Sequence, residues 1–499
     1  MENFSFLLDG LINALSVQNI LATIVGAILG LIIGAMPGIG PVAGVALLLP
    51  ITFKMDPTTA IIMLAALYYA NMYGGSFSSI LLNIPGDSAA IMTGLDGYEL
   101  TAQGKAGKAL FISNFSSFIG SFIGIVMLTI FGPMLADVGV KFGPSEMAAL
   151  ILLALTAIGF LLGVDPMKGL IAACLGILIA TVGVDPVSGL PRFSFGSVDL
   201  LSGIDFIPLV VGMFGFSQVF DMLLAKQDFS YMGGKRLTIR ESILTKDEYK
   251  KIMPATLRSS IIGTSVGIIP GVGGTVASFL AYVFEKRVSK NKENFGKGAM
   301  EGVAAAEAAN NGSASSSFAP MLSLGIPSSA TSAVMLGGLM MWGLRPGPQL
   351  FRDNPDFVWG LIGSMYIGNI ICILMSLAVI PFLMNILMIP IGIMTPLVAV
   401  LCIVGAYTSA NSMFGVGVMV VAGIVAYFLQ INKFPLAPLL LANVLTQRFE
   451  QSIRQSFEIS NGHPGIFLYK PITFTLLLCT LLFALLPLIK KVIKKKVRS

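Results

Sequence analysis

The stretch GLIIGAMPGIG, residues 30–40, decides how this chain folds, because it places Pro37 inside an apolar run. The same spacing of glycine and proline returns as GTSVGIIPGVG at residues 263–273. Proline removes a backbone donor from a helix, and neighbouring glycines loosen the hydrogen-bond ladder further. Both stretches are therefore predicted to contain a broken helix. The predicted breaks fall at Pro37 and Gly38 in the first stretch and at Pro270 and Gly271 in the second.

Two further motifs repeat in the same order along the chain. NIPG at residues 83–86 is followed 242 positions later by GIPS at residues 325–328. Gly107-x2-Leu110 returns as Gly347-x2-Leu350, with an offset of 240 positions. Together with the offset of 233 between Pro37 and Pro270, these matches predict a chain built from two related halves.

The composition places both halves in a membrane. Of the 499 residues, 55% are hydrophobic and only 11% are charged, whereas soluble domains carry about 25% charged residues. The mean hydropathy is +0.87. Each membrane span consumes roughly 20 apolar residues, so the length allows on the order of ten to fourteen crossings. We expect an all-α polytopic membrane protein, and the same composition excludes a disordered, collagen-like or disulfide-stapled chain.

The basic residues indicate which parts of the chain face the cytoplasm. Of 31 Lys and Arg, 13 lie between Lys226 and Lys297, and six lie in the tail from Lys490 to Arg498. Basic residues that flank apolar segments follow the positive-inside rule. No stretch interleaves them with aromatic residues, so a nucleic-acid partner is not expected. Residues 1–19 carry no Lys or Arg, which is unlike a cleaved signal peptide.

We expect five parts in the chain: an N-terminal interfacial segment (1–19), a first transmembrane half (20–225), a cytoplasmic basic loop (226–254), a second transmembrane half (255–450), and a last part with a polar loop, a final transmembrane helix and a basic cytoplasmic tail (451–499). The first half follows a stretch without basic residues, whereas the second half follows a basic one. The two halves should therefore begin on opposite sides of the membrane, as inverted repeats do.

Broken helices in corresponding positions of two halves point to a transporter binding site. In hydrocarbon, a break is tolerated only where the freed backbone groups are buried in protein or line a wet cavity. The N-termini of half-helices would then direct N–H groups at an anion. For the glycines of the first stretch (Gly26, Gly30 and Gly34), packing against a neighbouring helix is the favoured interpretation.

Two polar clusters accompany the breaks, at residues 71–79 and 307–317. Polar groups at this density in a membrane chain are costly unless they meet a solute, an ion or each other; mutual satisfaction remains the alternative to a site. The predicted substrate-binding residues are Asn71, Gly74, Gly75, Ser76, Pro85, Gly86 and Ser88 in the first half, and Asn310, Asn311, Ser313, Ser315, Pro327, Ser328 and Ser329 in the second. Asp87 and Glu307 are the candidates for coupling a cation, whereas Glu301 fits a loop position.

Other chemistries find no support in the sequence. A GxxxxGK[ST] motif is missing, so an ATP-driven pump is not expected. The only histidine, His463, has no partner acid nearby in sequence, and the four cysteines are scattered through apolar runs. We expect no catalytic residues, no metal site and no cofactor other than a bound sodium ion or proton. We interpret Asp56, Asp165 and Asp185, which each precede a proline, as helix caps.

The sequence resembles a known family, the large membrane subunit of tripartite tricarboxylate transporters (TctA-like). The motifs that carry the resemblance cover roughly residues 15–450; they include GAMPGIGP (34–41), YGGSFSSILLNIPGD (73–87), LDGYELTAQGKAGKAL (95–110), GVDPVSGLPRFSFG (183–196), IIPGVGG (268–274), EAANNGSASSSFAPMLSLGIPSSATSAVMLGG (307–338) and GLRPGPQLF (343–351). The chain departs from the family's pattern in the serines at 313–317 and at Ser328-Ser329, which change the hydroxyl count of the pocket.

The resemblance implies a secondary active transporter of a bacterial inner membrane. It implies a small four-span membrane subunit and a periplasmic solute-binding protein as partners, besides membrane lipid, with a homodimer left open. The substrates would be citrate-like tricarboxylates or other carboxylates, with uptake coupled to a proton or sodium gradient. Two alternatives stay open: a carboxylate channel, and a polytopic enzyme or scaffold that binds a polar ligand without moving it.

Overall fold

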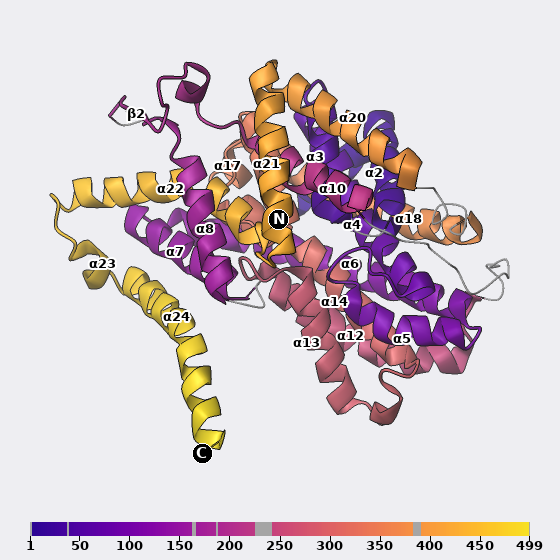
Figure 1. The fold of residues 1–499 in the computed structure, drawn as a ribbon. Helices are drawn as coiled ribbons and strands as arrows, with labels where there is room; N and C mark the ends of the chain where they lie inside the picture. The colour runs from indigo at the N-terminus through magenta and orange to yellow at the C-terminus, as the bar shows by residue number, and fades with distance from the viewer. Residues whose placement is uncertain are drawn as a thin grey trace.

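The computed structural model describes residues 2–36, 39–161, 166–185, 188–224, 242–382 and 391–498. Apart from a two-residue antiparallel pair, β1 with β2, the regular structure in these ranges is helical (Figure 1). The first half contains α1 (Glu2–Ala14), α2 (Val17–Ala35), α3 (Gly40–Thr52), α4 (Pro57–Leu82), α5 (Ile91–Ala102), α6 (Ala106–Val140), α7 (Pro144–Leu161), α8 (Pro166–Ala180), β1 (Gly183–Val184), β2 (Pro191–Arg192), α9 (Phe206–Val210) and α10 (Ser217–Leu224).

The rest of the described chain begins inside the segment 226–254, which was expected to be a loop. It contains α12 (Lys246–Ile268), α13 (Gly273–Val288), α14 (Met300–Ser316), α15 (Phe318–Leu324), α16 (Ala330–Met341), α17 (Leu350–Asp353), α18 (Pro355–Val379), α20 (Ile391–Ala410), α21 (Met413–Ile431), α22 (Leu436–Ile459), α23 (Ile466–Tyr469) and α24 (Pro471–Arg498). Figure 1 shows α24 projecting from the lower side of the molecule, away from the hairpin that contains β2.

Six helices in the described ranges are long and apolar enough to span a membrane: Val17–Ala35, Ala106–Val140, Phe206–Leu224, Pro355–Phe382, Gly392–Ala410 and Met413–Ile431. Shorter apolar helices accompany them, at Gly40–Thr52, Pro144–Ala157, Pro166–Ala180, Ala330–Met341 and Pro471–Leu485. The expected all-α polytopic architecture is confirmed.

The break predicted in the second half is present. α12 ends at Ile268 and α13 begins at Gly273, with Gly271 and Gly273 at φ values of 77° and 68°. In the first half, α2 ends at Ala35 and α3 begins at Gly40; Pro37 and Gly38 lie outside the described residues. With 13 residues, α3 is about 20 Å long, too short to cross a hydrocarbon core of about 30 Å alone.

Capping side chains set several helix starts. The Asp56 carboxylate accepts hydrogen bonds from the backbone of Thr58 and Thr59 at the start of α4, as expected. α12 begins at Lys246, inside the segment expected to be a loop, because Thr245 and Glu248 form a capping box. The expectation for Asp185 is wrong: it lies beside the β1–β2 hairpin, where its carboxylate pairs with the guanidinium of Arg454.

Glycines bring α2 against α4 and α12 against α14 at equivalent positions. A Cβ atom added to any of these glycines would collide with a backbone carbonyl oxygen of the facing helix, and only glycine permits so close an approach. The pairs are Gly30 with Leu67 and Gly34 with Asn71 in the first half, and Gly263 with Ala309 and Gly267 with Ser313 in the second. The facing residues again differ by 242 positions, so the duplication extends to helix packing.

The two ends of α6 show how the halves are related. At its start, Lys108 pairs with Glu248 at the start of α12. At its other end, a Cβ atom on Gly139 would lie 2.6 Å from the ring of Pro348, just ahead of α17 and α18.

The start of α18 is linked in turn to the starts of α4 and α2. Near the start of α18, Gly360 lies against Thr58 at the start of α4. α4 is joined there to α2, because the Thr59 hydroxyl donates to the Asn19 side chain at 2.8 Å.

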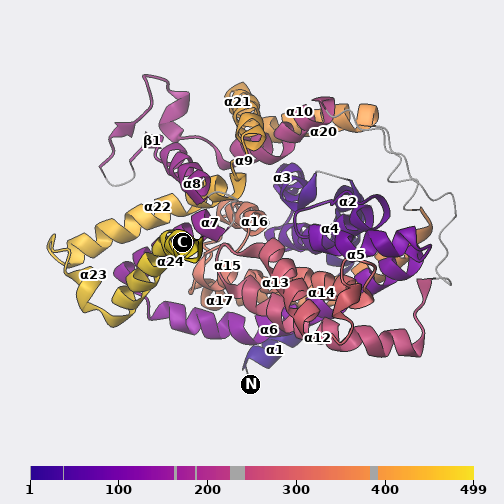
Figure 2. The ribbon, with the colours of Figure 1, turned by 60° about the horizontal axis from the view of Figure 1, so that its bottom comes forward.

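The equivalent helices α2 and α12 therefore begin at opposite ends of α6, which lies beside α12 and α14 (Figure 2). This is the relation expected of inverted repeats.

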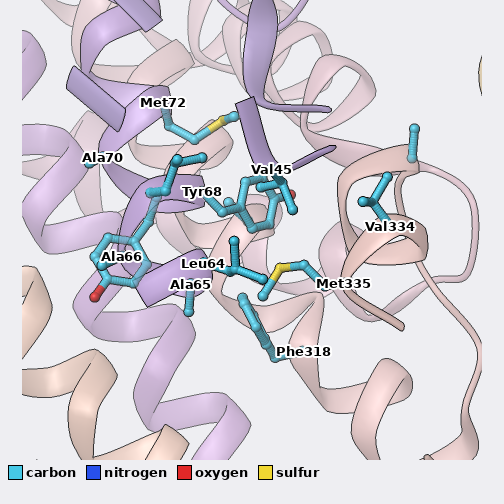
Figure 3. Packing of buried hydrophobic residues seen from close by; sticks show 14 of the residues in the cluster. Val45, Leu64, Ala65, Ala66, Tyr68, Ala70, Met72, Phe318, Val334 and Met335 are labelled. Atoms are coloured by element: carbon cyan, nitrogen blue, oxygen red, sulfur yellow. The ribbon is translucent and has the colours of Figure 1, made fainter. Parts of the chain in front are cut away.

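The hydrophobic core lies where the halves meet. Figure 3 shows Leu64 and Tyr68 of α4 beside Phe318 and Met335 of the second half. The rings of Tyr68 and Phe318 are 6.1 Å apart between centroids. This packing fixes the first polar cluster, on α4, relative to the second, on α14.

Candidate functional site

Three helix starts from both halves meet at one place, which we call the junction. The hydroxyl oxygens of Ser88, just ahead of α5, and Thr275, in the first turn of α13, are 2.7 Å apart. A Cβ atom on Gly273, the first residue of α13, would lie 3.8 Å from the Cβ of Ser329, which precedes α16. The starts of α5, α13 and α16 thus lie side by side.

Side chains at equivalent positions accept backbone N–H groups ahead of α5 and at the start of α16, although only the Ser329 side chain caps its helix. The Asp87 carboxylate accepts a hydrogen bond from the Ala90 N–H at 2.8 Å, and the Ser329 hydroxyl accepts one from the Ser332 N–H at 3.2 Å. Residues 87 and 329 differ by the repeat offset of 242 positions. α13 has no side-chain cap, so its first N–H groups remain available to a ligand.

Unpaired polar side chains occur on α4, on α14 and at the junction. Both amide atoms of Asn71 and of Asn310 are buried without a hydrogen-bond partner among the described residues, and so is the hydroxyl of Ser328. A Cβ atom on Gly274 would lie 2.5 Å from Oδ1 of Asn310, so this amide faces the start of α13. Burying an unpaired amide costs free energy, so these groups indicate a place for a solute, an ion or water.

A second polar group, which we call the carboxylate cluster, consists of Thr93, Ser117, Glu307 and Asn311. The Glu307 carboxylate is fully buried and accepts hydrogen bonds from the hydroxyls of Thr93 and Ser117. The Asn311 amide donates to the Ser117 hydroxyl at 2.7 Å and to the Glu307 backbone carbonyl at 3.1 Å. No Lys, Arg or His pairs with Glu307 in the part of the chain that the structure describes.

The structure places some of the predicted site residues at the junction and others against neighbouring helices. Gly75, Asp87, Ser88, Asn310, Ser328 and Ser329 lie at or beside the junction, and Pro85, Gly86 and Pro327 belong to the turns that lead into it. A Cβ atom on Gly75 would lie 3.6 Å from the Asp87 carboxyl carbon.

The other predicted residues face neighbouring helices instead. Ser76 meets the Ser113 hydroxyl of α6 at 2.7 Å, and Ser315 lies against Gly124 of α6. Asn311 faces α6 as well, through Ser117. Gly74 packs on α2, and the backbone of Ser313 packs on α12. Ser76 therefore fits the alternative to a ligand site, in which polar side chains hydrogen-bond to one another. The side chains of Asn310 and Ser328 have no such partner among the described residues.

Several residues of the two polar groups were missed in the sequence. Tyr68, whose hydroxyl lies 3.3 Å from that of Ser329, precedes Asn310 by the repeat offset of 242 positions, and this equivalence could have indicated it. Thr275 follows the second break directly. Thr93 lies on α5, where nothing in its local sequence marks it, whereas Ser117 lies on α6 in the run SNFSS at residues 113–117, whose polar density could have indicated it.

Asp96 was also missed, although it ties the halves together. One of its carboxylate oxygens accepts the backbone N–H groups of Gly296, Gly298 and Ala299 at 2.7–2.9 Å. The other accepts the Tyr282 hydroxyl at 2.8 Å. Asp96 thereby holds α5 against the turn that leads into α14, which carries Glu307 and Asn310.

Inverted repeats, broken helices and a polar junction between the halves define a polytopic membrane protein of the repeat-built transporter class. The sequence matches the tripartite tricarboxylate transporter TctA family over residues 20–441. The chain belongs to this family, which comprises the large subunits of tripartite tricarboxylate transporters. It is a transporter family rather than an enzyme family, and it implies further subunits and a binding protein.

Two relatives come from Agrobacterium vitis. An "uncharacterized 52.8 kDa protein in TAR-I ttuC' 3'region" is 39% identical over 493 residues, which cover 98% of each chain. An "uncharacterized protein in TAR-II ttuC' 3'region" is 38% identical over 231 residues, covering 46% of this chain and 96% of the relative. No solved structure matches the chain.

Proposed function

We propose that this protein is the permease subunit of a binding-protein-dependent secondary transporter that imports a tricarboxylate or a related small carboxylate. Uptake is coupled to a proton or sodium gradient across a bacterial inner membrane. A small four-span membrane subunit completes the membrane complex, and a periplasmic solute-binding protein delivers the substrate. The observation that carries the proposal is the meeting of three helix starts beside the unpaired amide of Asn310.

The junction suits a carboxylate that has to be released again. The uncapped start of α13 presents backbone N–H groups and the positive end of a helix dipole. The amide of Asn310 and the hydroxyl of Ser328 add neutral donors. None of the side chains that we place at the junction is Lys or Arg. A substrate held by neutral donors, with its charge balanced by a coupled cation, dissociates once that cation leaves.

The carboxylate cluster suits the coupling cation. Glu307 supplies a buried carboxylate without a basic partner among the described residues. Ser117 and Thr93 add hydroxyl oxygens, and Oδ1 of Asn311 is unpaired. Hard cations prefer such oxygen ligands, and a proton on Glu307 would likewise remove the buried charge. Asp87 at the junction is the second candidate.

The contacts of α6 support a cytoplasmic C-terminus. The start of α6 pairs with α12, directly after the basic insert. α6 is 35 residues long, about 50 Å, so its end reaches the other membrane face. There Lys470, just before α24, pairs with Glu146. The basic tail at the far end of α24 therefore returns to the side of the basic insert, as the positive-inside rule requires.

Flux into proteoliposomes tests the proposed function. The two membrane subunits are reconstituted, and uptake of labelled citrate and other carboxylates is measured with the binding protein present or omitted. We expect uptake that requires both the binding protein and an inward sodium or proton gradient. Flux that depends on neither would indicate a channel, and the lack of flux for every carboxylate would indicate an enzyme or scaffold.

A further inference from the structure

A cavity of about 880 Å³ lies apart from the junction, between the end of α6, the loop 343–349 and one face of α22. Its polar lining comes from Arg345, Arg448 and three glutamines, Gln349, Gln447 and Gln451. Gln447, Arg448 and Gln451 are three or four residues apart on α22, so they share one helix face. Among the described residues, the cavity lining contains no Asp or Glu.

The two arginines of this cavity lack acidic partners in the described part of the chain. Nη1 of Arg448 donates to the backbone carbonyls of Leu324 and Pro346 at 3.0 and 3.1 Å, which fixes the guanidinium without neutralising it. Arg345 is exposed and makes no ion pair with a described residue. The cavity therefore holds two positive charges beside amide donors, and the backbone carbonyls fix that of Arg448.

Two arginines outside this cavity, by contrast, are paired with acidic side chains. Arg192 pairs with Glu450 at 3.0 Å, and Arg454 pairs with Asp185 at 2.8 Å. Glu450 lies on α22, two residues after Arg448, so acids do occur at this end of the molecule. Charge compensation is thus present around the cavity and lacking inside it, which is the arrangement expected of an anion site.

We propose that this cavity binds small di- or tricarboxylates, with the guanidinium groups of Arg345 and Arg448 as charged donors and the glutamines as neutral ones. Guanidinium groups match carboxylates in geometry, and two of them suit an anion with two or more carboxylate groups. The volume accommodates an anion of this size together with water.

The position gives this site a role in the transport path. Phe142 and Met147 line the cavity on either side of Glu146, which pairs with Lys470 at the start of α24. The proposed orientation places this end of α24 outside the cytoplasm. Gly325 also lines the cavity and lies three residues before Ser328 of the junction. The cavity is thus an outer vestibule that receives the carboxylate first; this role rests on the proposed function, whereas the binding itself does not.

Cysteine protection measures binding without transport. Gln451→Cys is introduced into a variant with Cys174 and Cys479 changed to serine, because these two are not buried. The rate of maleimide labelling is then measured in purified protein at increasing citrate, with mannitol as a neutral control. We expect citrate, and not mannitol, to slow the labelling.

Arg345→Gln is the decisive variant, since Arg345 is exposed and makes no ion pair with a described residue. We expect it to raise the half-protecting citrate concentration about tenfold, the loss of one charge-assisted hydrogen bond. Arg352→Gln removes an exposed arginine outside the cavity and should leave that concentration unchanged. Arg448→Lys keeps the charge but not the geometry, and should weaken protection as well.

Equal protection by citrate in the Gln451→Cys parent and in both Arg345→Gln and Arg448→Lys made in that parent would overturn the proposal, as would no protection at all. Labelling slowed by phosphatidylglycerol and not by citrate would assign the cavity to a lipid headgroup and also overturn it. If citrate protects as expected but no carboxylate is transported with the complete complex, the binding site stands and the proposed function fails.

Discussion

Asn310 and Asn311 are neighbours in the chain, yet their amides face different surroundings. Successive residues of a helix point about 100° apart. The Asn310 amide faces the start of α13 and has no partner among the described residues. The Asn311 amide donates to Ser117 and to the backbone of Glu307. Asn310 is therefore placed to bind a solute, whereas Asn311 positions the carboxylate cluster.

Replacing Asn310 by alanine should weaken substrate binding. Hydrogen bonds to a charged group contribute about 1.5–3 kcal/mol, so Asn310→Ala is expected to raise the half-saturating carboxylate concentration roughly ten- to a hundredfold. The measurement is initial uptake against substrate concentration in proteoliposomes. Ser364→Ala is a matched control, because the hydroxyl of this buried serine bonds only to its own helix. An unchanged half-saturating concentration in Asn310→Ala would remove Asn310 from the site.

Replacing Asn311 or Ser76 by alanine should abolish or severely reduce uptake while leaving membrane insertion intact. Asn311 holds Ser117 beside Glu307, and Ser76 joins α4 to α6 through Ser113. Both changes disturb the surroundings of the coupling carboxylate rather than the folded core. Uptake and expression level are measured together. Wild-type rate and affinity in both variants would show that neither residue serves transport.

At the residue scale, the sequence predicted that these polar side chains matter but not which of them act together. The density of amides and hydroxyls at 71–79 and 307–317 made them visible. Their division between the junction and the faces toward α6 depends on helix rotation, which the repeat pattern leaves open. Thr93 and Ser117 bond to Glu307 from helices some 200 residues away, so local sequence does not indicate that Glu307 is their partner.

At the scale of elements, the glycine contacts are the clearest consequence of the duplication. Gly30 and Gly263 occupy equivalent positions, and each lies against a carbonyl oxygen of the facing helix. The sequence predicted these breaks and packing faces because proline and glycine act locally. It placed the start of α12 too late, because the Thr245–Glu248 capping box lies within a charged segment that resembles a loop.

Alanine at Gly30 or at Gly263 should destabilise the protein by similar amounts. The added Cβ would meet the Leu67 oxygen at 2.5 Å in one case and that of Ala309 at a still shorter distance in the other. Overpacking typically costs 1–3 kcal/mol, so about this loss is expected in each variant. The measurement is thermal unfolding in detergent. Gly417→Ala is the control, because a Cβ there meets nothing within 4 Å; a comparable loss in that control would refute the packing explanation.

At the scale of the whole molecule, the contacts of α6 predict which surfaces share a side of the membrane. Glu293 lies near the turn held by Asp96, toward the start of α6. His463 lies in the turn between α22 and α23, which precedes Lys470 and α24 toward the end of α6. In a variant with Cys174 and Cys479 changed to serine, an impermeant maleimide added outside intact cells should label His463→Cys and not Glu293→Cys. Labelling of both from the same side would contradict the orientation and, with it, the inverted arrangement.

The central claim is that a carboxylate bound between the two halves moves together with a cation held at Glu307. The most direct measurement is citrate accumulation in proteoliposomes that contain the complete complex and an imposed sodium or proton gradient. The account predicts accumulation above equilibrium in the wild type and in Glu301→Gln, whose carboxylate pairs with Lys251 instead. It predicts that Glu307→Gln loses this accumulation. Full gradient-driven accumulation in Glu307→Gln would contradict the account.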